Sequence, residues 1–496
     1  MWPYPLFPIR PLTSSKTTPM QRFAPPRLAS VALTLLALSL AVGIGPRTSQ
    51  AQQPQDTTQV TFNEAVRTAL DQNTDIKRAQ ASARQSNVQV RAEWMDFVPD
   101  LSLRSSVTRQ YGRNFSQVTG GFTTESTDFF NLSGSSGITL FNGFENVASL
   151  QQAQQQATAD QTSLKRTQRE VVFTVMDQFI ALVESREIVR VREEQVEAQR
   201  QRLRQIREFV DAGSRPRSDE FTAEADLADA EQQLLQGRRE LEVNKTRLIQ
   251  TLQLNPREAY DFQVPDLEGD TLGAAQYDLS ALVDEAFEKR LDLRVAEAER
   301  RAAQQGIRSA RSTYYPTISL SGDYGTDWTS RGQFRDPENP DQIIDPSFTD
   351  QLNNNRGGGV SLSLSIPIFD QLQRSTQVQQ AQVQAQNAKY ALQDQRQQVA
   401  LQVRQSYLDY QNAVQQLEAA NKRFRAAERA RTAAQERYRL GSADIVELQN
   451  AIRDYVDAAS QQVRARYNLI FQQKRIDYNV GRLSPNAPLL GRPASR

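Results

Sequence analysis

Two long stretches without proline or glycine limit the fold of this chain more than any other feature. No proline or glycine occurs between Gly143 and Gly213, and a similar stretch runs from Asp370 to Leu440. About 68 residues at a rise of 1.5 Å per residue make a helix of roughly 100 Å. Such helices do not fit inside a globular core, so the chain is predicted to form long helical hairpins.

Mostly apolar residues recur at every seventh position within both stretches. In the first stretch the series is Val175, Leu182, Val189, Val196, Leu203 and Val210. The second stretch has the corresponding series Val403, Tyr410, Leu417, Phe424, Arg431 and Tyr438, and the helix returning from the first continues it with Leu227, Leu234, Leu241 and Leu248. This interval is typical of coiled coils. It occurs in simple fibres as well, so by itself it does not identify the architecture.

The chain contains one structural unit twice. Residues 74–81 resemble residues 291–298, and residues 98–103 resemble residues 315–320. Gly213-Ser214 and Gly441-Ser442 occupy equivalent places after the long stretches. We therefore divide the chain into a first repeat (52–256), a linker (257–277), a second repeat (278–483) and a C-terminal tail (484–496). Strands are expected at about 99–111, 131–141, 316–328 and 358–368, and long helices at about 143–210, 216–254, 370–440 and 443–480.

The expected strands have a period of two instead of seven. In the clearest case Val360, Leu362, Leu364, Ile366 and Ile368 alternate with Ser361, Ser363 and Ser365. One apolar face and one small polar face suit a strand between lipid and a water-filled lumen. A half-buried hairpin in a soluble protein is the alternative origin of this pattern.

Four strands cannot close a barrel, and a sheet in lipid cannot leave its edges unpaired. The chain is therefore predicted to oligomerise. Two copies would supply about eight strands with a filled interior, whereas three would supply twelve and leave room for a pore.

The composition excludes most enzyme chemistry. The chain has 59 basic and 58 acidic residues, no cysteine and no histidine. Disulfides, thiolate nucleophiles, histidine metal sites and histidine triads are thereby excluded. The carboxylates are scattered, and neither charge is concentrated in one half of the chain. We therefore predict no catalytic site, no metal site, no cofactor and no nucleic-acid partner.

Residues 1–51 have the features of a signal peptide. Arg22 and Arg27 precede an apolar run from residue 28 to residue 42, and Ser49-Gln50-Ala51 suits cleavage after Ala51. Translation starting at Met20 is an alternative. The apolar run is shorter than the ~20 residues of a membrane-spanning helix. An exported protein is expected, either soluble beyond the inner membrane or inserted in the outer membrane through strands.

The order strand, strand, long helix, helix, repeated behind a signal peptide, resembles the TolC-like outer-membrane efflux proteins over about residues 61–483. The Arg437-Tyr438-Arg439-Leu440-Gly441 segment resembles the Arg-Tyr-x-x-Gly turn of that family. The resemblance implies a mainly α-helical protein with a transmembrane β part. It implies a homotrimer with a 12-stranded barrel in the outer membrane and a helical tunnel in the periplasm.

The resemblance also implies partners and a gate. Its tunnel would meet a periplasmic adaptor and an inner-membrane transporter, so that substrates cross the outer membrane unchanged. Family members close the tunnel with acidic and polar residues just beyond the turns, which map to Asp219, Glu447 and Asn450. Tyr438 maps to a tyrosine that bonds to the other hairpin, with Asp219 as its partner.

One residue of the family gate is absent. Ala443 occupies the position of a basic latch residue, and either Arg215 or Arg217 would have to replace it. We expect the adaptor to contact the turns themselves, at Gly213, Ser214, Leu440, Gly441 and Ser442. The alternative function is a soluble periplasmic coiled-coil adaptor or scaffold.

Overall fold

The structure, a computed structural model, describes residues 58–116, 120–263, 275–336, 338–339 and 341–484. All of them belong to one compact unit, Gln55–Arg496. The predicted signal peptide 1–51, with its alternative start at Met20, lies outside the described residues. So do the C-terminal tail from residue 485 onward and residues 264–274 of the predicted linker.

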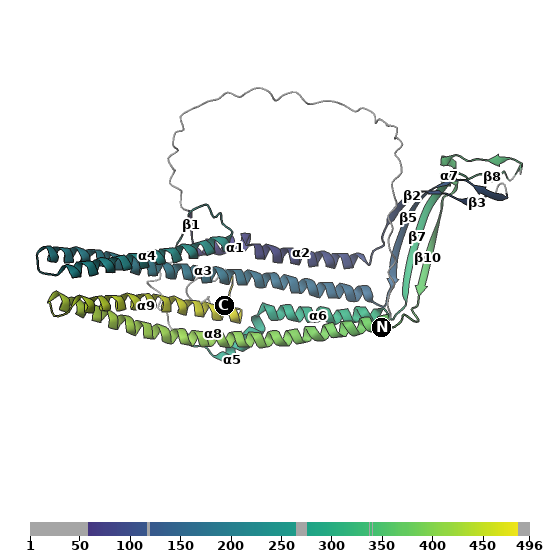
Figure 1. The fold of residues 1–496 in the computed structure, drawn as a ribbon. Coiled ribbons are helices and arrows are strands. Elements are labelled where there is room, and N and C mark those ends of the chain that lie inside the picture. The colour runs from purple at the N-terminus through teal and green to yellow at the C-terminus, as the bar shows by residue number, and fades with distance from the viewer. Residues whose placement is uncertain (1–57, 117–119, 264–274, 337, 340, 485–496) are drawn as a thin grey trace, which may run out of the picture. The chain divides into compact units, whose positions relative to one another are not determined.

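The described part is mainly helical, and the two repeats have helices of identical length. The first repeat contains α1 (Phe62–Gln72), α2 (Thr74–Met95), α3 (Glu145–Asp211) and α4 (Arg217–Leu252). The second contains α5 (Leu279–Lys289), α6 (Leu291–Ser312), α8 (Gln373–Arg439) and α9 (Ile445–Val480). Both α3 and α8 have 67 residues, and both α4 and α9 have 36. Equal lengths keep the two hairpin turns level with each other (Figure 1).

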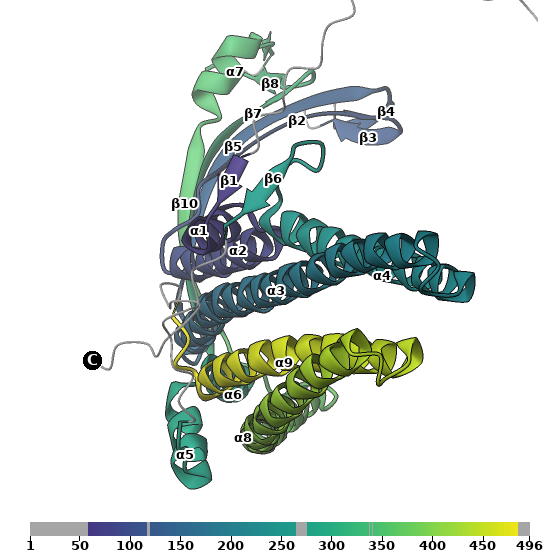
Figure 2. The same ribbon diagram turned by 90° about the vertical axis from the view of Figure 1, so that its left-hand side faces the viewer.

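The long helices lie side by side. Helix α3 packs against α2, α4, α6 and α9, whereas α8 packs against α5, α6 and α9. Helix α8 therefore lies at one side of the helical layer, with α4 and α2 at the other (Figure 2).

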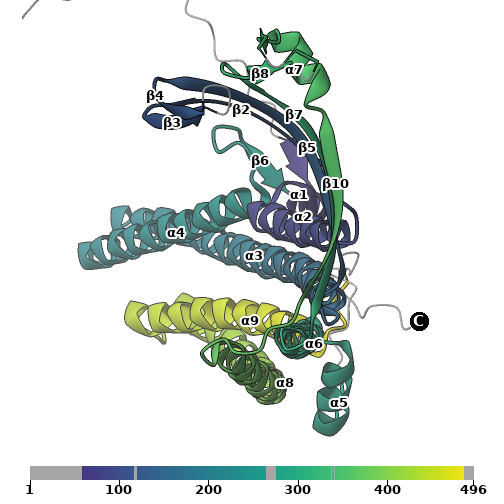
Figure 3. The same cartoon turned by 90° about the vertical axis from the view of Figure 1, so that its right-hand side faces the viewer.

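A four-stranded antiparallel sheet joins the two repeats. Its strands are β2 (Ser102–Gln110), β5 (Thr127–Phe141), β7 (Thr317–Thr329) and β10 (Gly357–Ser365), in the order β10-β7-β5-β2. The curved sheet is visible in Figures 2 and 3. Strand β10 is shorter than the expected 358–368 because Pro367 has no backbone N–H to pair.

The register gives the sheet two chemically different faces. Leu362 pairs with Leu320, which pairs with Ile138 on its other side, whereas Ser363 pairs with Ser319. The apolar face carries Leu103, Val107, Leu132, Ile138, Ile318, Leu320, Tyr324, Val360, Leu362 and Leu364. The serine face carries Ser102, Arg104, Ser135, Ser319, Ser321, Ser361 and Ser363, with Ser102–Ser135 and Ser319–Ser363 hydroxyl contacts of 2.7 Å.

Small elements that the sequence did not predict extend the sheet beyond its strands. They are the hairpin β3 (Arg113–Ser116) and β4 (Gly121–Thr124), the hairpin β8 (Phe334–Arg335) and β9 (Ile343–Ile344), and helix α7 (Phe348–Asn354). The side chain of Gln351 fixes α7 to the end of β7 through both the N–H and the carbonyl oxygen of Thr329, each at 3.0 Å. A further two-stranded parallel sheet pairs β1 (Thr58–Val60) with β6 (Tyr260–Phe262).

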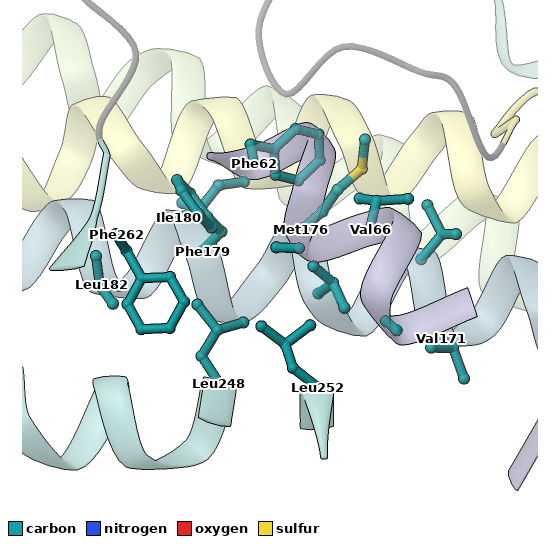
Figure 4. Close-up of a cluster of buried hydrophobic side chains, with 14 of the residues drawn as sticks. Phe62, Val66, Val171, Met176, Phe179, Ile180, Leu182, Leu248, Leu252 and Phe262 are labelled. Atoms are coloured by element: carbon teal, nitrogen blue, oxygen red, sulfur yellow. The ribbon is translucent and has the colours of Figure 1, made fainter. Parts of the chain in front are cut away.

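The largest hydrophobic core lies near the middle of α3 (Figure 4). Phe179 is fully buried between Phe62 and Phe262, with ring centroids 5.4 and 6.4 Å away. Tyr467 and Ile470 of α9 belong to the same core, so it joins the two repeats. The heptad residues Val175 and Leu182 are both buried there. The coiled-coil interval therefore marks the contact face of α3 in this region.

Candidate functional site

The two hairpin turns have the same backbone geometry. A glycine with a left-handed backbone lies two residues beyond the end of both α3 and α8, with φ 71° at Gly213 and φ 72° at Gly441. Ser214 and Ser442 each donate a backbone hydrogen bond of 2.9 Å to a carbonyl five residues earlier. Apart from the glycine and its chain neighbours, no atom of the described residues lies within 4 Å of a Cβ added at either position. Only backbone conformation therefore requires glycine at these two positions.

Arg215 connects the first turn to the second hairpin. Its guanidinium lies 3.5 Å from the carboxylate of Asp219 in the first turn of α4. The same guanidinium lies over the ring of Tyr438 in α8, 4.4 Å from the centroid. Arg215 and Arg217 were the two candidates to replace the missing latch residue, and Arg215 is the one that lies between Asp219 and Tyr438. Arg217 is exposed and has no ion pair within the described residues.

Tyr438 and Asp219 are not hydrogen-bonded to each other in the single chain. The hydroxyl of Tyr438 is buried and has no hydrogen-bond partner among the described residues. Two guanidinium groups lie over its ring, those of Arg215 and Arg202. The two predicted gate residues are thus brought near each other through Arg215, with no direct bond between them.

Glu447 forms an ion pair that the sequence did not predict. Its carboxylate contacts the guanidinium of Arg437, which lies on the opposite helix of the same hairpin. The side chain of Asp444 accepts a hydrogen bond of 2.7 Å from the Glu447 backbone N–H and begins α9. Asn450 lies further along α9 and is exposed. A signal for the pair was available, since Arg437 and Glu447 stand on either side of Gly441 at comparable distances.

Buried polar atoms without hydrogen bonds gather near the turns. Eleven such side-chain atoms occur among the described residues, and eight belong to residues within about five helical turns of Gly213 or Gly441. They are the three guanidinium nitrogens of Arg202 and single atoms of Gln195, Asp226, Arg431, Tyr438 and Gln449. The burial of the Arg202 guanidinium was not predicted, because Arg202 has the spacing of an ordinary surface residue.

Burial shifts the pKa of two charged groups in this region. It lowers the pKa of the Arg202 guanidinium, although Tyr438 and Asp226 oppose the shift. It also raises the pKa of the Asp226 carboxyl, against the effects of Arg202 and Arg453. Both shifts have the direction that desolvation of a charged group produces. The region near the turns therefore contains charged groups that are poorly solvated and incompletely hydrogen-bonded.

A small apolar contact lies between these charges and the turns. Leu203, Ile206 and Ala223 of the first hairpin are buried, and Ile445 of the second packs against them. The contact is much smaller than the core around Phe179.

The described residues offer little support for other kinds of site. None of their helices is long and apolar enough to cross a membrane. They contain no group of three or more acidic residues arranged to hold a metal ion.

The chain is similar to known outer-membrane proteins. A family model described as "Outer membrane efflux protein" matches residues 65–252 and 282–482. The outer membrane protein TolC of Salmonella enteritidis is 26% identical over 206 residues, which cover 42% of this chain and 40% of that protein. The match thus spans less than half of this curated relative.

Solved structures of outer-membrane channels have a similar fold. A crystal structure of CusC, described in terms of transmembrane channel formation, has a TM-score of 0.71 at 16% identity and covers 87% of this chain and 95% of that one. The outer-membrane channel OprN has a TM-score of 0.71 at 21% identity, with 85% of this chain and 89% of that one covered.

Proposed function

This chain belongs to the outer membrane efflux protein family, and we propose that three copies of it form the outer-membrane channel of a tripartite export system. The channel would combine a 12-stranded barrel in the membrane with a helical tunnel in the periplasm. Substrates would pass through it chemically unchanged. The alternative, a soluble coiled-coil adaptor or scaffold, is not favoured by the family.

The observation that carries the proposal is the sheet with two unpaired edges. Within the described part of the chain, strands β2 and β10 each have a neighbour on one side only. They run in opposite directions, because the four strands alternate in direction. The edge strand β2 of one copy can therefore pair antiparallel with β10 of the next, and this addition can continue until a ring closes.

The apolar residues on that sheet support its insertion in lipid. Leu103 is 78% exposed, Val360 82% and Leu364 61%. A soluble protein has little reason to expose such a continuous apolar face. The serine face would then line the lumen.

Helix α8 supports the same ring at the level of the tunnel. Val383, Tyr390, Leu401 and Leu408 are all exposed in the single chain. Their spacings of seven, eleven and seven residues put them on one face of the helix. Because α8 lies at one side of the layer, a neighbouring copy would cover this face.

Two substitutions test the assignment of the sheet faces. Leu364→Asp puts a charge on the apolar face and should cost about 2–4 kcal/mol near the bilayer midplane. Ser363→Asp, one residue away on the serine face, should be tolerated. The readouts are recovery in the outer-membrane fraction and native mass in detergent. Equal damage from both variants would mean that the faces are wrongly assigned, whereas a soluble monomeric wild type would exclude the channel.

The hairpin turns are proposed as the gate and as the contact with the adaptor. Gly213, Ser214, Leu440, Gly441 and Ser442 lie about 100 Å of helix away from the strands. Asp219, Tyr438, Glu447 and Asn450 would narrow the tunnel just inside them. Because Arg437 pairs with Glu447, the ring that three copies of Glu447 would form is expected to be less negative than a ring of unpaired carboxylates.

Single-channel conductance in planar bilayers tests this gate. Arg215→Gln removes the group between Asp219 and Tyr438 and should raise the open fraction. Arg217→Gln removes an equal charge from an exposed, unpaired arginine nearby and is the control. If both variants conduct like the wild type, the channel is closed by other residues. Glu447→Gln should mainly weaken cation preference.

A further inference from the structure

A hollow lies on the apolar face of the sheet, within one copy of the chain. Its volume is about 570 Å³, and all four strands contribute to its lining. The walls are mostly apolar and include Leu101, Leu103, Leu132, Tyr324 and Val360. This hollow is separate from the hairpin turns and plays no part in the proposed gate.

Missing side chains create the hollow. Gly134 and Gly322 lie on the apolar face between larger neighbours. A Cβ added at Gly134 would come no closer than 3.8 Å to any atom, and one at Gly322 no closer than 3.7 Å. Neither glycine has a positive φ. The backbone therefore does not require glycine at either position, and both leave space that a side chain could fill.

An arginine borders the hollow at the end away from the helices. Arg356 lines it and precedes Gly357, the residue that pairs with Gly325. Its Nε donates to the carbonyl of Asn353 at 2.8 Å, and its guanidinium has no ion pair within the described part of the chain. Asp323 belongs to the serine face by register. The guanidinium is thus a cation available to an anion at the border of an apolar hollow.

The position of Arg356 matches the level of a lipid headgroup. Trp328 lies two residues beyond Thr326 in β7 and belongs to an aromatic cluster around Phe348. The ring centroid of Phe348 lies 5.5 Å from that of Trp328 and 5.6 Å from that of Phe130. Tryptophan is enriched at the boundary between lipid and water. From Arg356 to Val360 the strand advances four residues, about 13 Å. One leaflet of the hydrocarbon core is about 15 Å deep, half of about 30 Å.

We propose that this hollow holds one acyl chain of an anionic, phosphate-bearing lipid, and that Arg356 binds the phosphate. The proposal rests on the proposed function to the extent that the apolar face must meet lipid. The apolar walls would contact the acyl chain, and the depth of the hollow fits one leaflet. The positive charge of Arg356 at its border would favour an anionic headgroup. Each assembled copy would carry one such lipid.

Native mass spectrometry of the whole protein in detergent tests the site. The probes are dioleoylphosphatidylglycerol, dioleoylglycerol with the same chains and no phosphate, and inorganic phosphate alone. Wild type should retain phosphatidylglycerol about fivefold better than dioleoylglycerol, the effect expected of one arginine at an anionic lipid surface. Inorganic phosphate should give no stable adduct, because it lacks the acyl chain.

Three variants separate the two parts of the site. Arg356→Gln should retain both lipids equally, and Gly134→Leu, which puts a side chain into the hollow, should weaken the retention of both. The matched control is Arg104→Gln, which removes an equal charge from the serine face at nearly the same level and should behave like wild type. A preference for phosphatidylglycerol that survives in Arg356→Gln, or lipid retention unchanged in Gly134→Leu, would overturn the proposal.

The same spectra distinguish failure of this site from failure of the channel. Trimer masses for all variants with no lipid preference in wild type would reject the lipid site and leave the channel standing. A wild type recovered only as a soluble monomer would reject both. Trimer mass in Gly134→Leu would show that loss of lipid does not reflect misfolding.

Discussion

The same long helices are held together very differently at their middle and at their turns. In the middle, Phe62, Phe179, Phe262 and Met176 form a core with little or no exposure. Near the turns, three buried residues form a small cluster, and eight buried side-chain atoms in this region have no hydrogen bond within the described residues. Heptad spacing is similar in both regions. The difference shows that a regular sequence pattern can produce a rigid contact in one place and a weak one in another.

The physical reason lies in what fills the contact face. Apolar burial contributes about 25 cal/mol per Å² of surface removed from water, whereas an unpaired buried polar group costs about 1–3 kcal/mol. The middle is stabilised by apolar burial and contains few unpaired buried polar groups. The contact near the turns buries less apolar surface and contains more of these unpaired polar groups. We therefore expect the hairpins to separate from the turns inward while the middle stays closed.

The largest effect should come from the middle. Phe179→Ala leaves a cavity in the largest core and should lower the free energy of unfolding by about 3–5 kcal/mol. Leu203→Ala, in the small cluster near the turns, should cost nearer the lower end of about 2–5 kcal/mol because its surroundings can collapse. Denaturant unfolding followed by circular dichroism measures both. Equal costs would remove the contrast between the two regions.

Near the turns an apolar replacement should stabilise. Arg202→Met removes three buried, unbonded nitrogens and should strengthen local closure by about 1–3 kcal/mol. Hydrogen exchange of peptides from the hairpin ends should become slower. Arg204→Met, at an exposed neighbour whose ion pair with Glu197 is 3.5 Å long, should change little. Faster exchange in Arg202→Met would mean that the Asp226 carboxylate and the Tyr438 ring already compensate the charge of Arg202.

The turn glycines allow a smaller and more local test. Gly441→Ala forces a Cβ into the left-handed region and should cost about 1–2 kcal/mol without any clash. Gly441→Asn should cost less, because asparagine tolerates this conformation. Local exchange at residues 437–445 is the readout. An equal loss in both variants would point to an unrecognised steric contact.

The smallest expected effect concerns an ion pair at the middle. Arg482 and Lys289 hydrogen-bond to Glu285 and lower the pKa of that carboxyl from its usual 4.5 to about 2. A lowered pKa adds stability above pH 4.5, and this stability is lost as the pH falls from 4.5 to 2.

Because solvent reaches this pair, we expect a contribution of about 1 kcal/mol. Glu285→Gln should lower the unfolding midpoint at pH 7 and have little effect at pH 2. Glu288→Gln, an exposed neighbour in the same helix, is the control. A difference between Glu285→Gln and wild type that persists unchanged at pH 2 would contradict this assignment.

Much of the architecture is determined by short-range sequence patterns. The absence of proline and glycine sets the length of α3 and α8, and the alternation of Val360, Leu362 and Leu364 with serines sets the faces of β10. The glycines at 213 and 441 mark the turns because few other residues adopt a positive φ. These features follow from the geometry of single helices and strands, so no knowledge of neighbours is needed.

Other features depend on which helices become neighbours. Arg431 occupies a heptad position, yet its guanidinium lies 3.6 Å above the ring of Tyr455 on the adjacent helix. Arg215 pairs with Asp219 and lies over Tyr438 because the two hairpins end side by side, whereas Glu447 pairs with Arg437 across the turn of a single hairpin. Long charged side chains pair with groups that are close in the folded chain, and heptad spacing does not predict which groups these are.

The duplication, the long helices, the two-faced strands and the positions of the turns can be predicted from the sequence. The folded chain was needed to show that the Arg202 guanidinium nitrogens are buried without a hydrogen bond, that Gln351 fixes α7 to β7, and that Gly134 and Gly322 leave a hollow beside Arg356. The physical reason is that periodicity reports which face of an element is apolar. Burial, charge pairing and empty space arise only when several elements meet.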